Sequence, residues 1–202
     1  MRVDPATIPV PEMPLIGETF AVELANSRYL GEHEDVDFLE HPEAVAIWFE
    51  NSAHLSDLAV PPGLDAAAAA ALRETRDATR LLLTQLADGS PALSEAAAEV
   101  LHRASGHAPG HVSLNVDDPR HPTWELHHEG DPDDVFLASV ATRCIVFLAG
   151  EEATRVRRCV RPGCPLLFTQ HHRTRRYCSE YCARKERQAR YYQATKQRRG
   201  TT

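Results

Sequence analysis

The chain has 202 residues and a formal net charge of −7 at pH 7, from 22 lysines and arginines and 29 aspartates and glutamates. This length suits one medium domain with a small appendage, and no apolar run approaches the length of a membrane span, so we expect no membrane contact. The charge is divided, because residues 151–202 carry +10 and the preceding 150 residues carry −17. A basic end beside an acidic body indicates a polyanion such as nucleic acid as a partner, or else a basic end that neutralises the body of the same molecule.

The N-terminal third is predicted to be mainly helical after an irregular arm. Residues 1–16 form the arm because four prolines interrupt them. They also lack the apolar core of a signal peptide, so we expect a cytoplasmic protein with reduced cysteines. Residues 20–30 are mainly apolar and are expected to be helical. A helix is also predicted over residues 41–55, where Pro42 suits the first turn. Its apolar face is expected to hold Val45, Trp48 and Phe49.

The middle of the chain is predicted to hold three helices and a β-hairpin. The longest helix covers residues 64–89, which are rich in alanine and leucine and stop at a glycine. A shorter amphipathic helix covers residues 91–105. Apolar and polar residues then alternate on both sides of DPRHP, which predicts a hairpin from segments 111–117 and 123–130. A helix with acidic residues in its first turn follows over 131–150. The inner face of the longest helix is expected to hold Leu72, Thr75 or Arg76, Thr79, Leu82, Leu83 and Leu86.

These elements predict an α+β protein that is mainly α. Residues 17–150 form a helical N-terminal domain with one β-hairpin, and residues 155–199 form a small treble-clef-like metal module. We expect no enzyme, because the sequence lacks a glycine-rich phosphate loop, a G-x-S-x-G motif and an H-E-x-x-H motif. His127 and His128 are adjacent in a predicted strand and therefore face opposite ways. A pocket among the helices remains a candidate site for a small effector. Cys144 is expected to be a small buried apolar residue.

Four cysteines define the module at the C-terminal end. Their spacing is C-x4-C-x13-C-x3-C, and two close pairs of thiolates are what a tetrahedral zinc site needs. Pro162 and Gly163 suit a tight turn within the first pair, Phe168 is the large apolar residue that fills the small core, and Ser179 suits the start of a helix at the second pair. The predicted ligands are Cys159, Cys164, Cys178 and Cys182.

We predict Zn²⁺ at these cysteines, because a segment with so few apolar residues needs metal in order to fold. A closed site of four thiolates is typical of structural zinc and leaves no open position for catalysis. Spacing alone does not distinguish zinc from iron. Disulfides are the other interpretation, though they are rare in a reducing compartment. His171 and His172 lie between the pairs and are alternative ligands, but with four cysteines present we expect them at the surface.

Basic residues surround the second cysteine pair. The arginine side chain offers a planar fork that suits phosphate oxygens and guanine edges. Arg184, Arg187 and Arg190 share one side of the last predicted helix. Of the tyrosines among these charges, Tyr177 and Tyr181 are expected to pack the module. The residues predicted to contact nucleic acid are Arg173, Arg175, Arg176, Arg184, Lys185, Arg187 and Arg190. The alternative is a solvated basic helix that docks on the acidic body or on a protein partner.

The chain resembles the CGNR zinc-finger family, bacterial proteins that join an N-terminal ABATE domain to a C-terminal cysteine module. The tetrapeptide that gives the family its name, Cys-Gly-Asn-Arg, reads Cys182-Ala183-Arg184-Lys185 here, so the charge is kept while glycine and asparagine are absent. The resemblance implies a stress-induced transcriptional regulator. The similar segments are ELANSRY (23–29), Asp37 with Leu39 and Trp48, LRETRDATRLLL (72–83), RVRRCVRPGCPLLF (155–168) and RTRRYCS (173–179).

From the residues and the resemblance together, we predict a DNA-binding transcriptional regulator. A structural zinc finger would contact DNA through its basic helix, and the N-terminal domain would sense an effector or associate with another molecule. The alternative is a zinc-stabilised protein–protein interaction module without direct DNA binding. One small module binds DNA weakly, so a specific regulator would need a homodimer, although the sequence has no coiled-coil seam that would form one.

Overall fold

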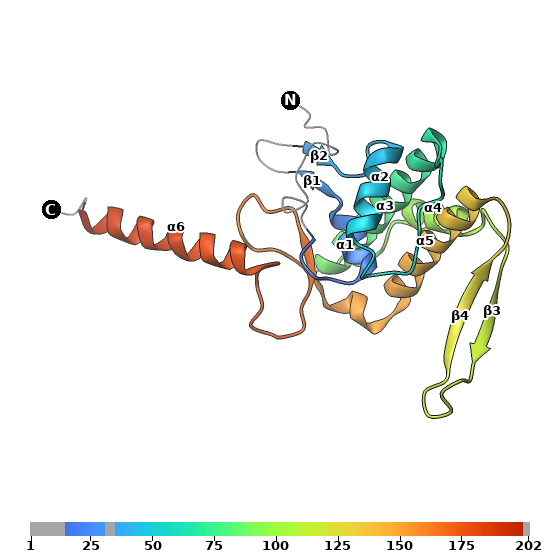
Figure 1. Cartoon of the computed structure of the whole chain (residues 1–202). Coiled ribbons are helices and arrows are strands. Elements are labelled where there is room, and N and C mark those ends of the chain that lie inside the picture. The colour runs from blue at the N-terminus through green and yellow to red at the C-terminus, as the bar shows by residue number, and fades with distance from the viewer. Residues whose placement is uncertain (1–14, 31–34, 200–202) are drawn as a thin grey trace.

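The computed structural model describes residues 15–30 and 35–199, and the expected irregular arm lies outside them apart from residues 15 and 16. Figure 1 shows a helical body, a hairpin arm at one end and a long helix that projects from the other end. The α+β, mainly α fold class predicted from the sequence is confirmed. The helices of the body are α1 (Phe20–Asn26), α2 (Pro42–Asn51), α3 (Ala66–Ala87), α4 (Glu95–Ser105) and α5 (Pro132–Ala149).

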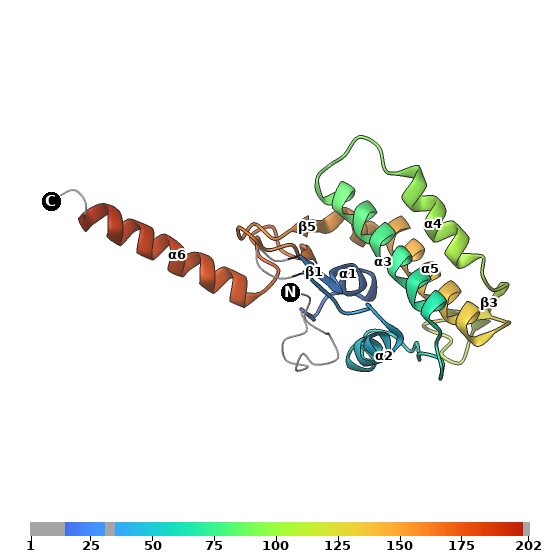
Figure 2. The ribbon, with the colours of Figure 1, turned by 90° about the horizontal axis from the view of Figure 1, so that it is seen from above.

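Helix α3 is the centre of the body and packs against α1, α4 and α5 (Figure 2). It begins where the Asp65 carboxylate accepts the N–H of Ala68 at 2.6 Å, a standard N-cap. Its predicted inner face is buried at Leu72, Thr75, Arg76, Thr79, Leu82 and Leu83.

Aromatic rings fill the core between α1, α2 and α5. The Phe49 ring packs edge-to-face against the rings of Trp48 and Phe136. In both pairs the ring centroids are 4.9 Å apart. The ring centroid of Phe20 in α1 lies 6.2 Å from that of Trp48. The predicted inner face of α2 is therefore confirmed, because Val45, Trp48 and Phe49 are all buried.

The described residues contain three antiparallel strand pairs, where the sequence predicted one hairpin in the body. The predicted pair is present as β3 (Gly110–Asn115) with β4 (Thr123–His128). The unexpected pair in the body is β1 (Arg28–Leu30) with β2 (Asp35–Asp37). The third pair, β5 (Val156–Arg158) with β6 (Leu167–Thr169), belongs to the cysteine module.

The predicted helix over residues 20–30 is wrong after Asn26. The Ser27 hydroxyl donates to the carbonyl of Leu24 at 2.6 Å and ends the turn, and the next residues pair with β2. Helix α4 also begins later than expected, at Glu95, because Ser94 is the residue that caps it.

The cysteine module packs directly on the body. A short 3-10 helix (Glu151–Arg155) connects α5 to β5. Val156 of β5 and Leu167 of β6 then join a buried cluster with Val22, Ala25 and Leu83 of α1 and α3. The last helix, α6 (Glu180–Arg199), leads away from this contact (Figures 1 and 2). None of the helices in the described ranges combines the length and apolarity needed to cross a membrane.

Candidate metal centre and basic helix

A tight turn aims the first two cysteines at the same point. The N–H of Cys164 donates to the carbonyl of Arg161 at 3.0 Å, with Pro162 and Gly163 as the two central residues. Gly163 has φ of 72°, as the third residue of a type II turn requires. The N–H of Cys159 donates to the carbonyl of Leu166 at 3.0 Å and closes the loop at its base.

The second pair lies at the start of α6. The Ser179 hydroxyl accepts the N–H of Cys182 at 3.4 Å, so this serine is the N-cap that the sequence predicted. Cys182 is in the first turn of the helix and Cys178 precedes it. Phe168 is 1% exposed and fills the small core between the two pairs, as expected.

The four sulfur atoms have the arrangement of a metal site. All of them lie within 4.8 Å of one another. The Cys164–Cys178 and Cys164–Cys182 sulfurs are 3.8 Å apart, and the Cys178–Cys182 sulfurs are 3.5 Å apart. Tetrahedral zinc with Zn–S bonds of about 2.3 Å places its sulfurs roughly 3.8 Å apart. The donor set and its size therefore fit a closed tetrahedral Zn²⁺ site, and all four cysteines are free of disulfides.

Three of the thiols, on Cys159, Cys164 and Cys178, share hydrogen bonds that shift their pKa values in opposite directions. Hydrogen bonds from the Cys164 and Cys178 thiols lower the pKa of Cys159 to about 2. The same hydrogen bond to Cys159 raises the pKa of Cys164 to about 11, and hydrogen bonds to Cys159 and Cys164 raise the pKa of Cys178 as well. A divalent cation would bind these groups as thiolates and so remove the competition among them.

Arg161 lies outside the ligand set and contacts it. Its Nε donates to the Cys182 sulfur at 3.3 Å. Four thiolates around a divalent ion have a net charge of −2, and a guanidinium beside one sulfur offsets part of that charge. His171 and His172 are exposed, and the described cluster of ligand atoms consists of cysteines alone.

Most of the basic residues predicted to contact nucleic acid are at the surface. Arg190 is exposed, although it also contacts Glu186 at 3.1 Å and the Tyr177 hydroxyl at 3.3 Å. The exposed set is Arg173, Arg176, Arg184, Lys185, Arg187 and Arg190.

Arg175 differs from the rest of the predicted set because its guanidinium has partners within the chain. Its guanidinium donates to the carbonyls of Thr169 at 3.1 Å and Cys178 at 2.7 Å, and it pairs with Glu18 at 2.7 Å. It also lies over the Phe168 ring, 4.8 Å from the centroid. These contacts make Arg175 part of the framework that holds the module together.

The tyrosines of this region are also of two kinds, one packed against the module and the others exposed. Tyr177 is partly buried against the module core, as expected. The packing role expected for Tyr181 is wrong, because this residue is 52% exposed, with the Lys185 ammonium 5.5 Å from its ring centroid. Tyr191 and Tyr192, further along α6, are each 71% exposed.

A set of buried polar contacts joins the module to the body, and these contacts were not predicted from the sequence. Asn26 is 1% exposed, and its amide donates to the carbonyl of Leu167 at 2.9 Å and accepts the N–H of the same residue at 3.0 Å. Glu18 accepts the N–H of Thr169 at 2.8 Å, and Arg80 donates to the carbonyl of Pro165 at 2.7 Å. The available signals were Glu18, just before α1, and Asn26 at the end of that largely apolar helix.

An ion pair within the body joins α3 to β2. Arg76 is 1% exposed and forms two hydrogen bonds of 2.8 Å to the two carboxylate oxygens of Asp37. Burial acts to raise the pKa of Asp37, but the hydrogen bonds and charge of Arg76 outweigh it, and the net pKa is lowered.

The alternative left open by the sequence, in which the basic end neutralises the acidic body, is represented among the described residues by two ion pairs. Arg158 pairs with Asp88 at 2.7 Å and Arg175 with Glu18. Both arginines precede α6, whereas α6 itself points away from the body (Figure 1).

Two family models match successive parts of the chain. The model of the ABATE family, described as a putative stress-induced transcription regulator, matches residues 18–151. The CGNR zinc-finger model matches residues 155–194. No curated protein matches the sequence. The chain therefore belongs to the ABATE family of putative stress-induced transcription regulators and has a CGNR zinc finger at its C-terminal end.

Proposed function

We propose that the protein is a transcriptional regulator that binds duplex DNA through α6. The observation that carries the proposal is an exposed basic helix that leaves a metal module and points away from an acidic body (Figure 2). Its 20 residues correspond to a length of about 30 Å. An α-helix fits the major groove of B-DNA, which is about 12 Å wide. The acidic body would be repelled by phosphate and would stay outside the groove.

Zinc is the metal that we propose for the four-cysteine site, and its role is structural. When bound, it supplies the folding energy that the few apolar residues of the module lack. Four sulfur ligands complete the tetrahedron, so the site has no position for a substrate and we propose no enzymatic activity there. The free cysteines suit the reducing cytoplasm of a bacterium.

The proposed DNA contacts come from two segments. Arg184 and Arg187 are exposed one turn apart on α6, and Lys185 lies between them. Arg173 and Arg176 are exposed in the loop before the second cysteine pair. We leave Arg175 out because its guanidinium is bound within the module.

Salt dependence tests this proposal. The affinity of the metal-loaded chain for a random-sequence duplex is measured by fluorescence anisotropy between about 50 and 200 mM salt, where each neutralised phosphate contributes a slope of about −0.9. Replacing Arg184 and Arg187 together by glutamine should weaken binding and reduce the slope by about 2. Arg103→Gln is the matched control, because Arg103 is also exposed but lies on α4.

The competing function is a protein-interaction module, and the exposed tyrosines on α6 favour it. Tyr181, Tyr191 and Tyr192 present aromatic surface on the same helix, and tyrosine is enriched at protein interfaces. If the metal-loaded chain has no salt-dependent affinity for duplex DNA, the DNA-binding proposal fails and the interaction module is the better reading. We assign the helical domain the role of sensing an effector.

A further inference from the structure

A strand with exposed apolar side chains lies at the end of the molecule opposite α6. Figure 1 shows the hairpin of β3 and β4 extending from the body there. The side chains of Val112, Leu114 and Val116 are 65%, 70% and 63% exposed. Among the other described side chains outside α6, the most exposed large apolar ones are Val146 and Val160, at 47%. Single exposed apolar residues are ordinary, whereas three in one stretch indicate an interaction site.

The backbone of this strand also has hydrogen-bonding groups that face outward. In the described part of the chain β3 has one neighbouring strand, β4, so its other edge is open. The N–H of Glu129 donates to the carbonyl of Pro109 at 3.0 Å, one step beyond the register of β3 with β4. Hydrogen-bonded and non-hydrogen-bonded positions alternate along an antiparallel pair. Val112 and Leu114 therefore occupy non-hydrogen-bonded positions, and their N–H and C=O groups point to the open edge.

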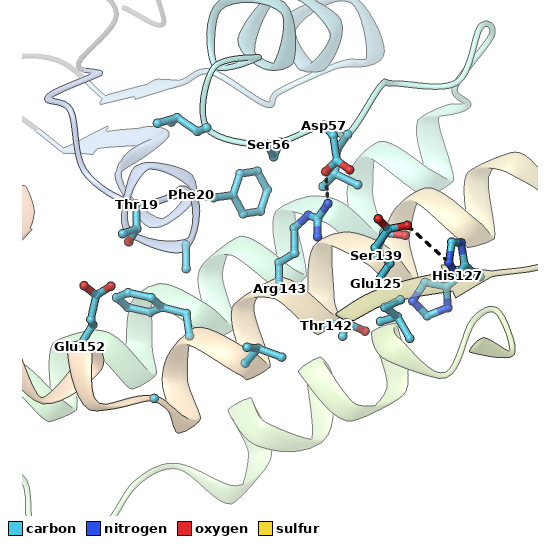
Figure 3. Close-up of a pocket in the computed structure, with 18 of the residues that line it drawn as sticks. Thr19, Phe20, Ser56, Asp57, Glu125, His127, Ser139, Thr142, Arg143 and Glu152 are labelled. Atoms are coloured by element: carbon cyan, nitrogen blue, oxygen red, sulfur yellow. Dashed lines mark hydrogen bonds and ion pairs between the residues drawn. The ribbon is translucent and has the colours of Figure 1, made fainter. Parts of the chain in front are cut away.

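The open edge of β3 lacks the protection that edge strands usually have. Natural edge strands carry charged residues or proline, which hinder pairing with another chain. Residues 110–116 contain no lysine, arginine, aspartate, glutamate or proline. The neighbouring strand β4 differs because it carries a glutamate and faces the body. Figure 3 shows Glu125 and His127 of β4 at the wall of a pocket that Arg143 of α5 also lines. β3 is thus the edge of the hairpin that is free to accept a strand.

Charge and pattern favour a second copy of this chain as the partner. Residues 1–150 carry a net charge of −17, so two bodies repel each other, and the uncharged β3 edge is a place where they approach without contact between like charges. In an antiparallel pair centred on Leu114, Val112 lies opposite Val116 of the other copy. The same register sets His111 opposite Asp117 of the other copy at both ends, where the imidazole can donate to the carboxylate.

We propose that the protein forms a symmetric dimer in which β3 pairs antiparallel with β3 of a second copy, with the two-fold axis at Leu114. The two hairpins then form one continuous sheet, and the exposed apolar residues of both β3 strands lie against one another on one face of it. Two paired short strands bury a small area, so we expect a dissociation constant on the order of 10 µM.

The dimer leaves the basic helices of both copies accessible. α6 leaves the body at the end opposite the hairpin (Figure 1), so the pairing of β3 leaves α6 of each copy exposed. The sequence has no coiled-coil seam, and β3 supplies a self-pairing surface in its place. The inference goes beyond the proposed DNA binding, because it concerns a contact between two copies that forms without DNA.

Sedimentation velocity and light scattering of the full-length, zinc-loaded chain test the pairing. The mass should rise from that of one chain, 22.4 kDa, toward twice that value between about 1 and 200 µM protein. Hydrogen exchange over the same range should show the amide of Leu114 becoming protected as dimers form, because its N–H gains a partner across the new strand pair. No DNA is present, so failure of the DNA-binding proposal leaves this result unaffected.

Charged variants at residue 114 test the register. Leu114→Lys sets two lysines opposite each other and Leu114→Glu sets two glutamates opposite each other, so each variant alone should dimerise about tenfold more weakly than wild type. An equimolar mixture of the two variants should recover dimers, because lysine then faces glutamate. This recovery distinguishes a lost contact from a damaged hairpin. Leu81→Lys is the control, because Leu81 is a 44% exposed leucine on α3, and it should leave the mass unchanged.

Each other outcome overturns the proposal. A wild-type chain that stays monomeric over this concentration range shows that β3 does not pair with a second copy. A dimer that survives Leu114→Lys has its interface elsewhere on the molecule. Lysine and glutamate variants that stay monomeric when mixed refute the two-fold axis at Leu114.

Discussion

Replacing Asn26 by alanine should loosen the cysteine module from the helical body. The Asn26 amide satisfies both the N–H and the carbonyl of Leu167, at 3.0 and 2.9 Å. Both residues are 1% exposed, so water does not reach these groups in the folded protein. Alanine has no polar group and leaves two buried backbone groups without partners.

The expected loss of stability follows from these two unpaired backbone groups. A buried donor or acceptor that loses its partner costs about 1–3 kcal/mol, so the pair predicts a loss of about 2–6 kcal/mol in the free energy of unfolding. For a protein of this size, 1 kcal/mol shifts the melting temperature by about 2–4 °C, and we expect Asn26→Ala to melt about 5–20 °C below the wild type.

Thermal and urea unfolding of the zinc-loaded protein, followed by circular dichroism, measures this loss. The matched control is Asn115→Ala, because Asn115 Oδ1 accepts the N–H of Asp117 at 2.9 Å in an exposed turn. Surface substitutions of this kind stay within about 0.5 kcal/mol. If Asn26→Ala and Asn115→Ala have the same stability, the junction does not depend on Asn26 and the reasoning is refuted.

Two further changes test the metal site and the buried carboxylate. Cys178→Ser should lose the metal and unfold residues 155–195, whereas Cys144→Ala should keep one metal per chain by elemental analysis, since Cys144 is buried in the body; one full equivalent of metal in Cys178→Ser would contradict the four-cysteine site. Glu23→Gln should keep both backbone hydrogen bonds to Oε1, from Ile16 and Glu18 at 2.8 Å. Burial raises the pKa of Glu23 above its ordinary value of 4.5, so its stabilising contribution is complete below that value and is lost as pH rises through the folded-state pKa. The stability of Glu23→Gln relative to wild type should therefore increase with pH in urea titrations; a difference independent of pH would show that Glu23 keeps its ordinary pKa.

The parts of the fold that depend on local pattern could be predicted from the sequence. Helical spacing identified the buried residues of α2 and α3 because each helix hides one side against the core. Spacing also identified the four cysteines, since ligands on tight turns are close together in sequence as well as in space. Gly163 and Ser179 follow from the same local geometry.

The parts that depend on distant contacts could not be predicted in this way. Strand β1 has three residues and is a strand only because it pairs with β2, so residues 28–30 were expected to continue a helix. Asn26 and Leu167 are 141 positions apart, and no local pattern connects them. Arg175 lies among exposed arginines in the sequence, and only the folded loop brings Glu18 and the Cys178 carbonyl to its guanidinium.

The junction uses residues from two of the segments on which the resemblance to the family rests. The segments that resemble the family, residues 23–29 and 72–83, supply Asn26 and Arg80, which bind the backbone of the module. The tetrapeptide Cys182–Lys185 lies at the other side of the cysteine cluster, near the start of α6. Its cysteine is kept as a ligand, while the next position is Ala183 in place of glycine. Alanine favours a helix by about 1 kcal/mol over glycine, so the change strengthens the turn that carries Cys182 and from which the basic side of α6 extends.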